Sequence, residues 1–306
     1  MERFFSDLAK KSFFLNLIVL GRPWNGIIIG LFSILGFIFL GGNDLLTILV
    51  LFFCFFLQYF AGTTFNDLYD FYSDKINMPY RPLESGVITS NEAKILAITL
   101  YVISLTFSWL FSFYIFLGVL AFFILSLLYS IIPFRLVSRG FLGNLTLATV
   151  TIFIPTITGA IVASQSIFLP FEFVLYVLYF TLFFAFFSIL KDFKDVTGDS
   201  KSGKKTFVVV HGIDLSGKIM IFGTVLFFLL SLFYLLELVL LDYVVLLVSL
   251  FFLVGLLIFE LKVFDKRNSA DNFYLLFSRT RILIFVYVLL VIILVYSSFS
   301  IALTLP

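Results

Sequence analysis

Two short stretches of the sequence carry carboxylates at the same helical spacing. Their members are Asp67, Asp70 and Asp74 in the first stretch and Asp192, Asp195 and Asp199 in the second. The spacing i, i+3, i+7 puts each trio on one stripe of a helix. Three carboxylates on one stripe repel one another unless a cation lies among them. The pattern therefore predicts two acidic stripes that face each other and hold a divalent metal ion.

The ligand types in these stretches favour one metal. Asn66 lies four residues before Asp70, on nearly the same helical face, and its amide oxygen is a neutral ligand. Carboxylate and amide oxygens suit Mg²⁺, which usually keeps water ligands and shares its coordination shell with substrate phosphates. Neither stretch has the nearby His or Cys pair that a zinc site would use. We therefore expect Mg²⁺ as the cofactor.

Basic residues surround both acidic stretches in the sequence. They are Lys75, Arg81, Arg135, Arg139, Lys191, Lys204 and Lys205. Carboxylates that hold a metal ion, together with cations that hold phosphate oxygens, describe a site for a diphosphate. The long apolar segments next to these stretches can enclose a hydrocarbon. These features together predict a substrate with a diphosphate head and an isoprenoid tail.

The composition places this chemistry in a membrane. Charged residues make up 12% of the 306-residue chain and hydrophobic residues 62%, and the mean hydropathy is +1.17. A soluble protein of this length could not cover its core with so little polar surface, so we expect an integral membrane protein of the all-α class. The net charge of +2 is too small to indicate a nucleic-acid partner.

Apolar segments long enough to cross a bilayer recur along the chain, at about 20 residues each. We place them at residues 24–41, 45–65, 95–111, 113–133, 142–164, 169–190, 218–240, 243–261 and 282–304. The sequence therefore predicts a multi-pass transmembrane bundle of about nine helices around a central cavity. It forms one membrane-embedded domain over residues 1–306, with two weakly repeated halves at roughly 22–140 and 141–306.

The distribution of basic residues predicts the orientation in the membrane. All 20 Lys and Arg residues precede the first predicted span or follow the second, fourth, sixth and eighth. Because Lys and Arg in short loops stay on the cytoplasmic side, these loops and the N-terminus are expected in the cytoplasm. The C-terminus is then outside the cell. Both Asp-rich stretches follow directly on the second and sixth spans, so they are expected as cytoplasmic, Asp-rich loops.

Several motifs resemble those of the UbiA superfamily of intramembrane prenyltransferases. The run from Asn66 to Asp74, followed by the segment 76–86, looks like the first signature of that family. The run from Lys191 to Asp199, followed by Gly203-x-Lys205-Thr206, is similar to the second. Two shorter segments also match, Tyr129-Ser130-x-x-Pro133-x-Arg135 and Arg22-Pro23-x-Asn25.

The resemblance implies roles for individual residues. The residues implied to hold Mg²⁺ are Asn66, Asp70, Asp74, Asp195 and Asp199, and those implied to bind the diphosphate are Arg81, Lys191, Arg135 and Lys205. In this reading the allylic carbon becomes cation-like as the diphosphate leaves, and an acceptor attacks it.

Four further residues are candidates for the catalytic chamber. Tyr129 and Asn25 are expected to line it, with the ring of Tyr129 stabilising a carbocation. Asp67 and Asp192 are expected to position the acceptor or the metal shell.

The sequence leaves the acceptor open. The motif spacing looks more like the branch that contains digeranylgeranylglyceryl phosphate synthases, chlorophyll synthases and homogentisate prenyltransferases. Within it, our leading hypothesis is transfer of a geranylgeranyl group to the hydroxyl of a glycerol-phosphate lipid precursor, in ether lipid synthesis. An aromatic acceptor, as in quinone, tocopherol or chlorophyll synthesis, remains the alternative. A cation-coupled transporter is the alternative from another class, although transport sites usually lie near the bilayer midplane.

Overall fold

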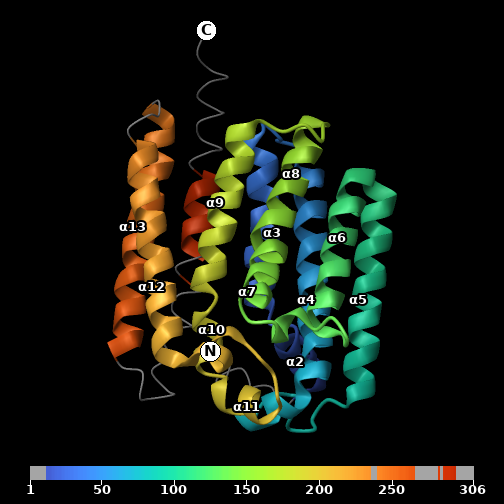
Figure 1. Ribbon diagram of the computed structural model, residues 1–306. Helices are drawn as coiled ribbons and strands as arrows, with labels where there is room; N and C mark the ends of the chain where they lie inside the picture. Colours follow the sequence, from blue (N-terminus) through green and yellow to red (C-terminus); the bar gives the residue numbers. More distant parts are fainter. Residues whose placement is uncertain (1–11, 236–239, 266–281, 283–284, 294–306) are drawn as a thin grey trace.

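The computed structural model describes residues 12–235, 240–265, 282 and 285–293 (Figure 1). Within these residues the secondary structure is helical, without a β-strand, which confirms the predicted all-α class. The first elements are α2 (Phe13–Leu20), α3 (Pro23–Phe39), α4 (Leu45–Asn77), α5 (Ser90–Phe111), α6 (Phe113–Ser130), η1 (Leu136–Ser138) and α7 (Phe141–Ala148). They are followed by η2 (Thr149–Phe153), α8 (Ile154–Ser164), α9 (Phe171–Phe187), α10 (Leu190–Phe193), α11 (Val196–Lys201), α12 (Phe207–Leu235) and α13 (Leu240–Asp265).

The long helices match the apolar segments found in the sequence. Among the described residues, six helices are long and apolar enough to cross a membrane, and α2 with α3, bent by 50°, makes a seventh if the pair counts as one span. The protein is therefore an integral, multi-pass membrane protein, as predicted. The count of nine spans stays a prediction, because most of the ninth segment, 282–304, lies outside the described residues.

Helix α4 is longer than a bilayer requires, and its last turns carry the first acidic stretch. It runs for 33 residues from Leu45 to Asn77, whereas about 20 residues cross the hydrocarbon core. At its start, the carboxylate of Asp44 caps the helix by accepting a hydrogen bond from the backbone N–H of Thr47 at 2.7 Å. The far end lies beside α11 at one end of the bundle (Figure 1).

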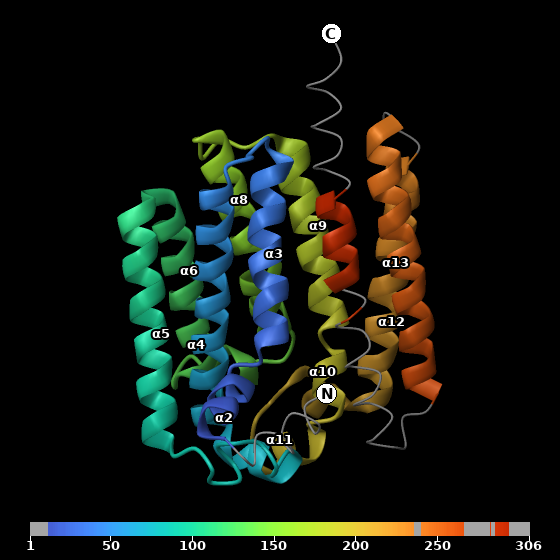
Figure 2. The ribbon, with the colours of Figure 1, turned by 180° about the vertical axis from the view of Figure 1, so that it is seen from behind.

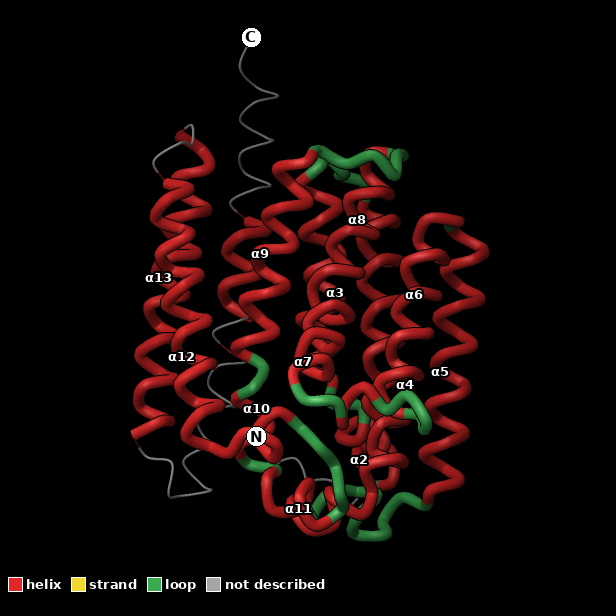
Figure 3. Tube along the Cα trace, viewed as in Figure 1, coloured by secondary structure: helices red, strands yellow, loops and turns green. Residues whose placement is uncertain are grey.

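The second acidic stretch does not form one helical stripe, so that part of the prediction is wrong. Figure 3 shows the chain leaving α9 and continuing through the short helices α10 and α11, and Asp195 lies between those two. Asn77, at the end of α4, stabilises the interruption. Its side chain donates to the carbonyl of Asp195 at 2.9 Å and accepts from the N–H of Gly198 at 2.8 Å. The carbonyl of Asp195 also accepts the helical bond from the N–H of Asp199 at 2.9 Å, so Asn77 adds a cap at the start of α11, where the N–H groups have no helical partner.

Helix α3 is held tightly against α8 on one side. A Cβ at Gly36 would collide with the backbone of Thr156, and one at Gly159 would collide with the carbonyl of Ser33. Glycine at both positions therefore lets the two backbones touch, which is a common way to pack membrane helices. Figure 2 shows α3 beside α4, with α8 behind them. Because α3 belongs to the first predicted half and α8 to the second, the halves interlock; their origin as a repeat stays a prediction.

Candidate active site

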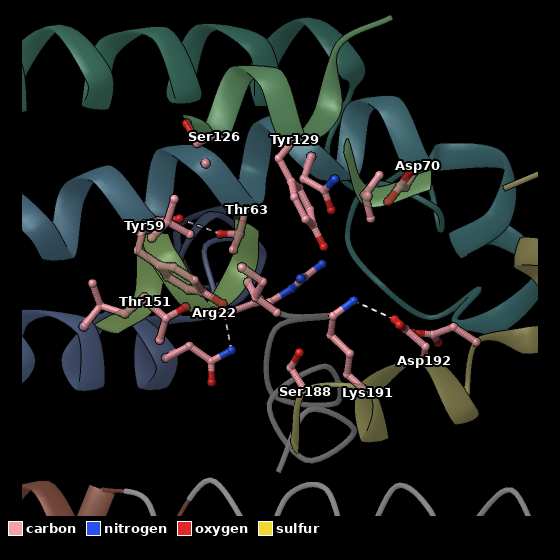
Figure 4. A pocket seen from close by; sticks show the side chains of 18 of the residues that line it. Arg22, Tyr59, Thr63, Asp70, Ser126, Tyr129, Thr151, Ser188, Lys191 and Asp192 are labelled. Carbon is pink, nitrogen blue, oxygen red and sulfur yellow. Dashed lines mark hydrogen bonds and ion pairs between the residues drawn. The ribbon is translucent and has the colours of Figure 1, made fainter. Parts of the chain in front are cut away.

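A cavity of about 220 Å³ opens among α3, α4, α6, η2, α9 and α10 (Figure 4). Most residues that the sequence analysis selected line it, namely Asn25, Asn66, Asp70, Asp74, Arg81, Tyr129, Lys191, Asp192 and Asp195. Its deeper wall is apolar and includes Ile28, Phe122 and Phe184. The tertiary fold therefore brings both acidic stretches to one cavity that is polar at one end and apolar at the other.

Asp70 is the most heavily paired carboxylate of the first stretch. Arg135 approaches one of its oxygens at 3.1 Å, and Lys204 approaches the other at 2.6 Å. Both Asp70 and Lys204 are buried. Although burial opposes it, the charges of Asp70 and then Asp199 raise the pKa of Lys204 above its ordinary value, so this lysine stays charged.

Asp74 and Asp67 share the guanidinium of Arg81. Arg81 lies 2.6 Å from an oxygen of Asp74 and 3.7 Å from one of Asp67. Asp67 also forms an ion pair with Arg22, and it lines a smaller cavity with these two arginines rather than the main one. The geometry therefore favours Asp67 as a residue that positions Arg22 and Arg81, not as a group that contacts the substrate.

Two of these arginines sit in a backbone conformation that is unusual for their type. Arg22 has φ = 50° and Arg135 has φ = 36°, both in the left-handed region. Each directly precedes a helix, and each pairs with a carboxylate of α4. Such residues cost about 1–3 kcal/mol and tend to occur at functional sites. Here the ion pairs with Asp67 and Asp70 help to offset that cost.

The second acidic stretch is also surrounded by lysines. Lys191 pairs with Asp192 at 2.6 Å, and Lys204 lies 3.6 Å from Asp199. Burial raises the pKa of Asp199 to about 7, Lys204 opposes the shift, and the nearby charges of Asp195 and Asp192 add to it. A carboxylate in such surroundings is stabilised by additional positive charge.

The donor set fits a hard, oxygen-ligated cation. One oxygen each of Asp195 and Asp199 is buried without a hydrogen-bond partner in the structure, and such oxygens suit Mg²⁺. Nevertheless, no three His, Cys, Asp or Glu side chains in the described part of the chain converge closely enough to hold an ion by themselves. Asp70 and Asp74 are instead paired with cations. The protein thus fits a metal ion whose shell is completed by substrate oxygens, as the sequence analysis expected.

Polar side chains from four helices, α3, α4, α6 and α10, reach the cavity. Tyr129 from α6 and Lys191 from α10 point into the same space (Figure 4). Asn66 donates a hydrogen bond to the hydroxyl of Ser130 at 3.2 Å, and Asn25 donates to the hydroxyl of Tyr59 at 2.8 Å. These contacts fix the two amides while leaving their oxygens available to a ligand.

Lys205 is the lysine predicted from the sequence to bind the diphosphate, but the side chain that lines the cavity is that of Lys204. Lys205 is exposed. Its backbone explains the difference: its N–H donates to Ser138 at 2.8 Å and its carbonyl accepts from Gly140 at 3.0 Å. This extended segment alternates its side chains between two faces, so neighbouring lysines point in opposite directions. The spacing of the motif does not indicate which of the two lysines faces the cavity.

Other lining residues were also missed as site residues. Arg22, Tyr59, Thr151 and Ser188 all reach the cavity (Figure 4). Arg22 belongs to the motif Arg22-Pro23-x-Asn25, which could have indicated it. Tyr59, Thr151 and Ser188 have no repeated spacing in the sequence, so only the tertiary structure identifies them. Arg135, which was predicted to bind the diphosphate, does not line the cavity itself. It forms an ion pair with Asp70, which does.

Comparison with known proteins assigns the chain to a family. The profile of the UbiA prenyltransferase family matches residues 26–282. The chain belongs to this family. Its enzyme class is therefore the one predicted, a prenyltransferase, and the transporter alternative is set aside.

Individual members of the family resemble the chain over most of its length. A digeranylgeranylglyceryl phosphate synthase of Thermococcus sibiricus is 33% identical over 201 residues, which cover 65% of this chain and 69% of that protein. The enzyme of the same name from Pyrococcus horikoshii is 30% identical over 206 residues, covering 66% and 71%.

Solved structures share the fold. A UbiA homologue from Archaeoglobus fulgidus, bound to GPP and Mg²⁺, has a TM-score of 0.71 at 20% identity and covers 94% of this chain and 100% of that one. A structure from work on digeranylgeranylglyceryl phosphate synthase has a TM-score of 0.63 at 24% identity, with coverages of 93% and 99%. At these identities the likeness is one of fold.

Proposed function

We propose that the protein is a Mg²⁺-dependent digeranylgeranylglyceryl phosphate synthase. It would transfer a geranylgeranyl group from geranylgeranyl diphosphate to the hydroxyl of a glycerol-phosphate lipid that already bears one such group. The observation that carries the proposal is the Thermococcus sibiricus relative of that name, which the match covers for 69% of its length. The cavity supports it, because it joins a strongly charged end to an apolar wall.

The charged end is proposed to bind the diphosphate. Lys204, Lys191 and Arg81 line the cavity and offer N–H groups to phosphate oxygens. Asp192 positions Lys191 through their 2.6 Å contact, and Arg135 supports the site through Asp70. The proposed Mg²⁺ ligands are Asn66, Asp70, Asp74, Asp195 and Asp199. When bound, the metal would neutralise the negative charge of the leaving diphosphate.

The middle of the cavity is proposed to hold the reacting carbon and the acceptor. The bond between the allylic carbon and the diphosphate oxygen breaks, and its electron pair leaves with the diphosphate. The acceptor hydroxyl then forms the new C–O bond and passes its proton to the released diphosphate. The ring of Tyr129 stabilises the cation-like carbon. Asn25 contacts the acceptor, and the guanidinium of Arg22 beside it suits the acceptor's phosphate.

The reaction is tested with the purified protein, Mg²⁺ and radiolabelled geranylgeranyl diphosphate. Geranylgeranylglyceryl phosphate, 4-hydroxybenzoate and homogentisate are offered as separate acceptors. We expect a product with the glycerol phosphate alone, and its loss in Asp70→Asn. Lys201→Met, which changes an exposed lysine, is the matched control and should keep activity. A product with an aromatic acceptor only would reject the proposed acceptor and leave prenyl transfer standing.

We also propose that the active-site end of the bundle faces the cytoplasm. Lys75, Arg81, Lys94 and Arg139 lie in or beside the segments at this end, whereas the opposite connections, 40–44 and 165–170, contain no Lys or Arg. This asymmetry is the one expected from the positive-inside rule. The N-terminus would then be cytoplasmic and the C-terminus outside, although both lie beyond the described residues.

Cysteine labelling tests the orientation, because the native Cys54 is buried. Ile167→Cys lies at the end opposite the site and Ser200→Cys at the active-site end, and both positions are exposed. In intact cells, a membrane-impermeant maleimide should label Ile167→Cys and not Ser200→Cys. Labelling of Ser200→Cys alone would invert the proposed orientation.

A further inference from the structure

The last residue of α4 holds the second acidic stretch through both groups of its amide. The side chain of Asn77 donates to the carbonyl of Asp195 at 2.9 Å and accepts from the N–H of Gly198 at 2.8 Å. These partners lie 118 and 121 residues further along the chain. The two residues before Asn77, Lys75 and Ile76, are exposed instead. One side chain therefore ties the helix of the first acidic stretch to the backbone of the second.

The backbones also come together at this point. A Cβ at Gly198 would collide with the carbonyl of Ser73 and with the amide of Asn77, so only glycine allows α11 to lie this close to α4. Beside Asn77, the sulfur of Met78 accepts from the ammonium of Lys194 at 3.6 Å. These neighbouring contacts seat the second acidic stretch on the end of α4, with α11 against it (Figure 1).

The two hydrogen bonds of Asn77 lie next to proposed Mg²⁺ ligands. Asp195 is itself one of them, and Gly198 directly precedes another, Asp199. One carboxylate oxygen of each aspartate is buried without a hydrogen-bond partner in the structure. Asn77 thus fixes the backbone of this segment and leaves these oxygens available to a cation. On α4, the proposed ligand Asp74 lies three residues before Asn77, on the neighbouring helical turn. Asn77 therefore lies beside ligands from both acidic stretches.

The second acidic stretch needs outside support because its own helices are short. Helices α10 and α11 have four and six residues, and Asp195 lies between them. Helices of this length gain little stability by themselves, so the direction of their carboxylates depends on what they pack against. Side chains that orient metal ligands from outside commonly contribute about ten- to a hundredfold to metal affinity.

We infer that Asn77 is a positioning residue of the metal site. It holds the carboxylates of Asp195 and Asp199 at the place, relative to α4, where a Mg²⁺ ion bound to the diphosphate needs them. Asn77 does not line the cavity itself, so its effect is exerted through the segment that it holds. The inference rests on the proposed function, in which these carboxylates bind Mg²⁺.

Metal binding without turnover tests the inference. Mn²⁺ replaces Mg²⁺, and free Mn²⁺ is measured by its EPR signal in the presence of a thiolodiphosphate analogue of the donor, whose C–S bond resists cleavage, with a protein-free sample as the blank. We expect Asn77→Ala to weaken Mn²⁺ binding by at least about tenfold. Gly198→Ala should also weaken it, because the added methyl group displaces α11 from α4. Asn16→Ala, which removes a side-chain bond to the carbonyl of Ser12, is the matched control and should keep the wild-type affinity.

The outcomes separate a positioning role from a purely structural one. In Asn77→Ala the Mg²⁺ concentration for half-maximal prenyl transfer should rise in step with the dissociation constant of Mn²⁺. Asn77→Gln keeps both groups of the amide on a longer side chain, so it should show a smaller loss, and it gives the readout should the alanine variant fail to fold. Unchanged Mn²⁺ affinity together with a lower unfolding temperature would overturn the inference. A wild type that binds Mn²⁺ and forms no prenylated product would remove the proposed function instead, and the affinities of the variants would still decide the role of Asn77.

Discussion

Lys204 and Asp70 form a buried ion pair at 2.6 Å, although they are 134 residues apart in the sequence. The contact joins the loop after α11 to the acidic stripe of α4. Lys204 also lies 3.6 Å from Asp199, so one ammonium group links both acidic stretches. The neighbouring Lys205 is exposed. Substituting each lysine in turn therefore tests which of the two binds the diphosphate.

Lys204→Met should lower kcat/KM for prenyl transfer by about a hundredfold or more, which is the usual loss when one charged group that stabilises the leaving group is removed. Lys205→Met should stay within about threefold of the wild type, as surface substitutions do. Steady-state kinetics with the labelled donor measure both. Equal losses in the two variants, or a larger loss in Lys205→Met, would contradict the assignment.

Asp195 and Asp199 each present a buried oxygen without a hydrogen-bond partner. If these oxygens hold Mg²⁺, Asp195→Asn and Asp199→Asn should raise the Mg²⁺ concentration needed for half-maximal activity by at least about tenfold. Asp214→Asn, at an exposed carboxylate on α12, is the control. The readout is product formation against Mg²⁺ concentration after removal of metal with EDTA. Full activity in excess EDTA would refute the metal requirement.

Glu84, in the loop between α4 and α5, is 6% exposed and neither of its carboxylate oxygens has a hydrogen-bond partner in the structure. Burial, and then the charges of Asp67 and Asp74, raise its pKa to about 8 from the ordinary value of 4.5. Between these two pH values the folded protein holds a proton that the unfolded chain releases. Stability from this group is therefore lost as the pH rises through the window.

Glu84→Gln removes this titration, so the variant should gain stability over the wild type as the pH is raised. We expect its advantage in unfolding temperature to be larger by at least about 2–4 °C at pH ~8.5 than at pH ~5, which corresponds to about 1 kcal/mol. Glu92→Gln, at the residue that forms the capping box with Thr89, should show no such gain. Thermal unfolding in detergent is the measurement, and parallel curves for wild type and Glu84→Gln would count against the prediction.

Tyr129 offers the cavity both a ring and a hydroxyl. If the ring stabilises the cation-like carbon, Tyr129→Phe should keep kcat within about tenfold of the wild type. Tyr129→Leu should lose roughly thirtyfold, because a cation over an aromatic face is worth about 2 kcal/mol when desolvated. Single-turnover rates separate this effect from donor binding. Similar losses in both variants would assign the role to the hydroxyl.

The amino-acid sequence by itself determined the membrane bundle, the all-α class and the family. Long apolar segments can satisfy their backbone groups in lipid only as helices, so the helices appear where hydropathy predicts them. The acidic stripe of α4 could also be predicted from the sequence, because Asp67, Asp70 and Asp74 lie on one continuous helix whose geometry fixes their spacing.

Only the tertiary structure decided which side chains meet. Asn77 caps the helix that restarts in the second acidic stretch through hydrogen bonds that cross 118 and 121 residues of sequence, and a helical spacing rule cannot anticipate bonds of that kind. Asp67 turns to Arg22 and away from the main cavity, although it shares a stripe with Asp70. The alternation that buries Lys204 and exposes Lys205 depends on pairing with Gly140. Local sequence fixes periodicity, whereas the partners of charged groups are selected by burial and by the distant segments packed against them.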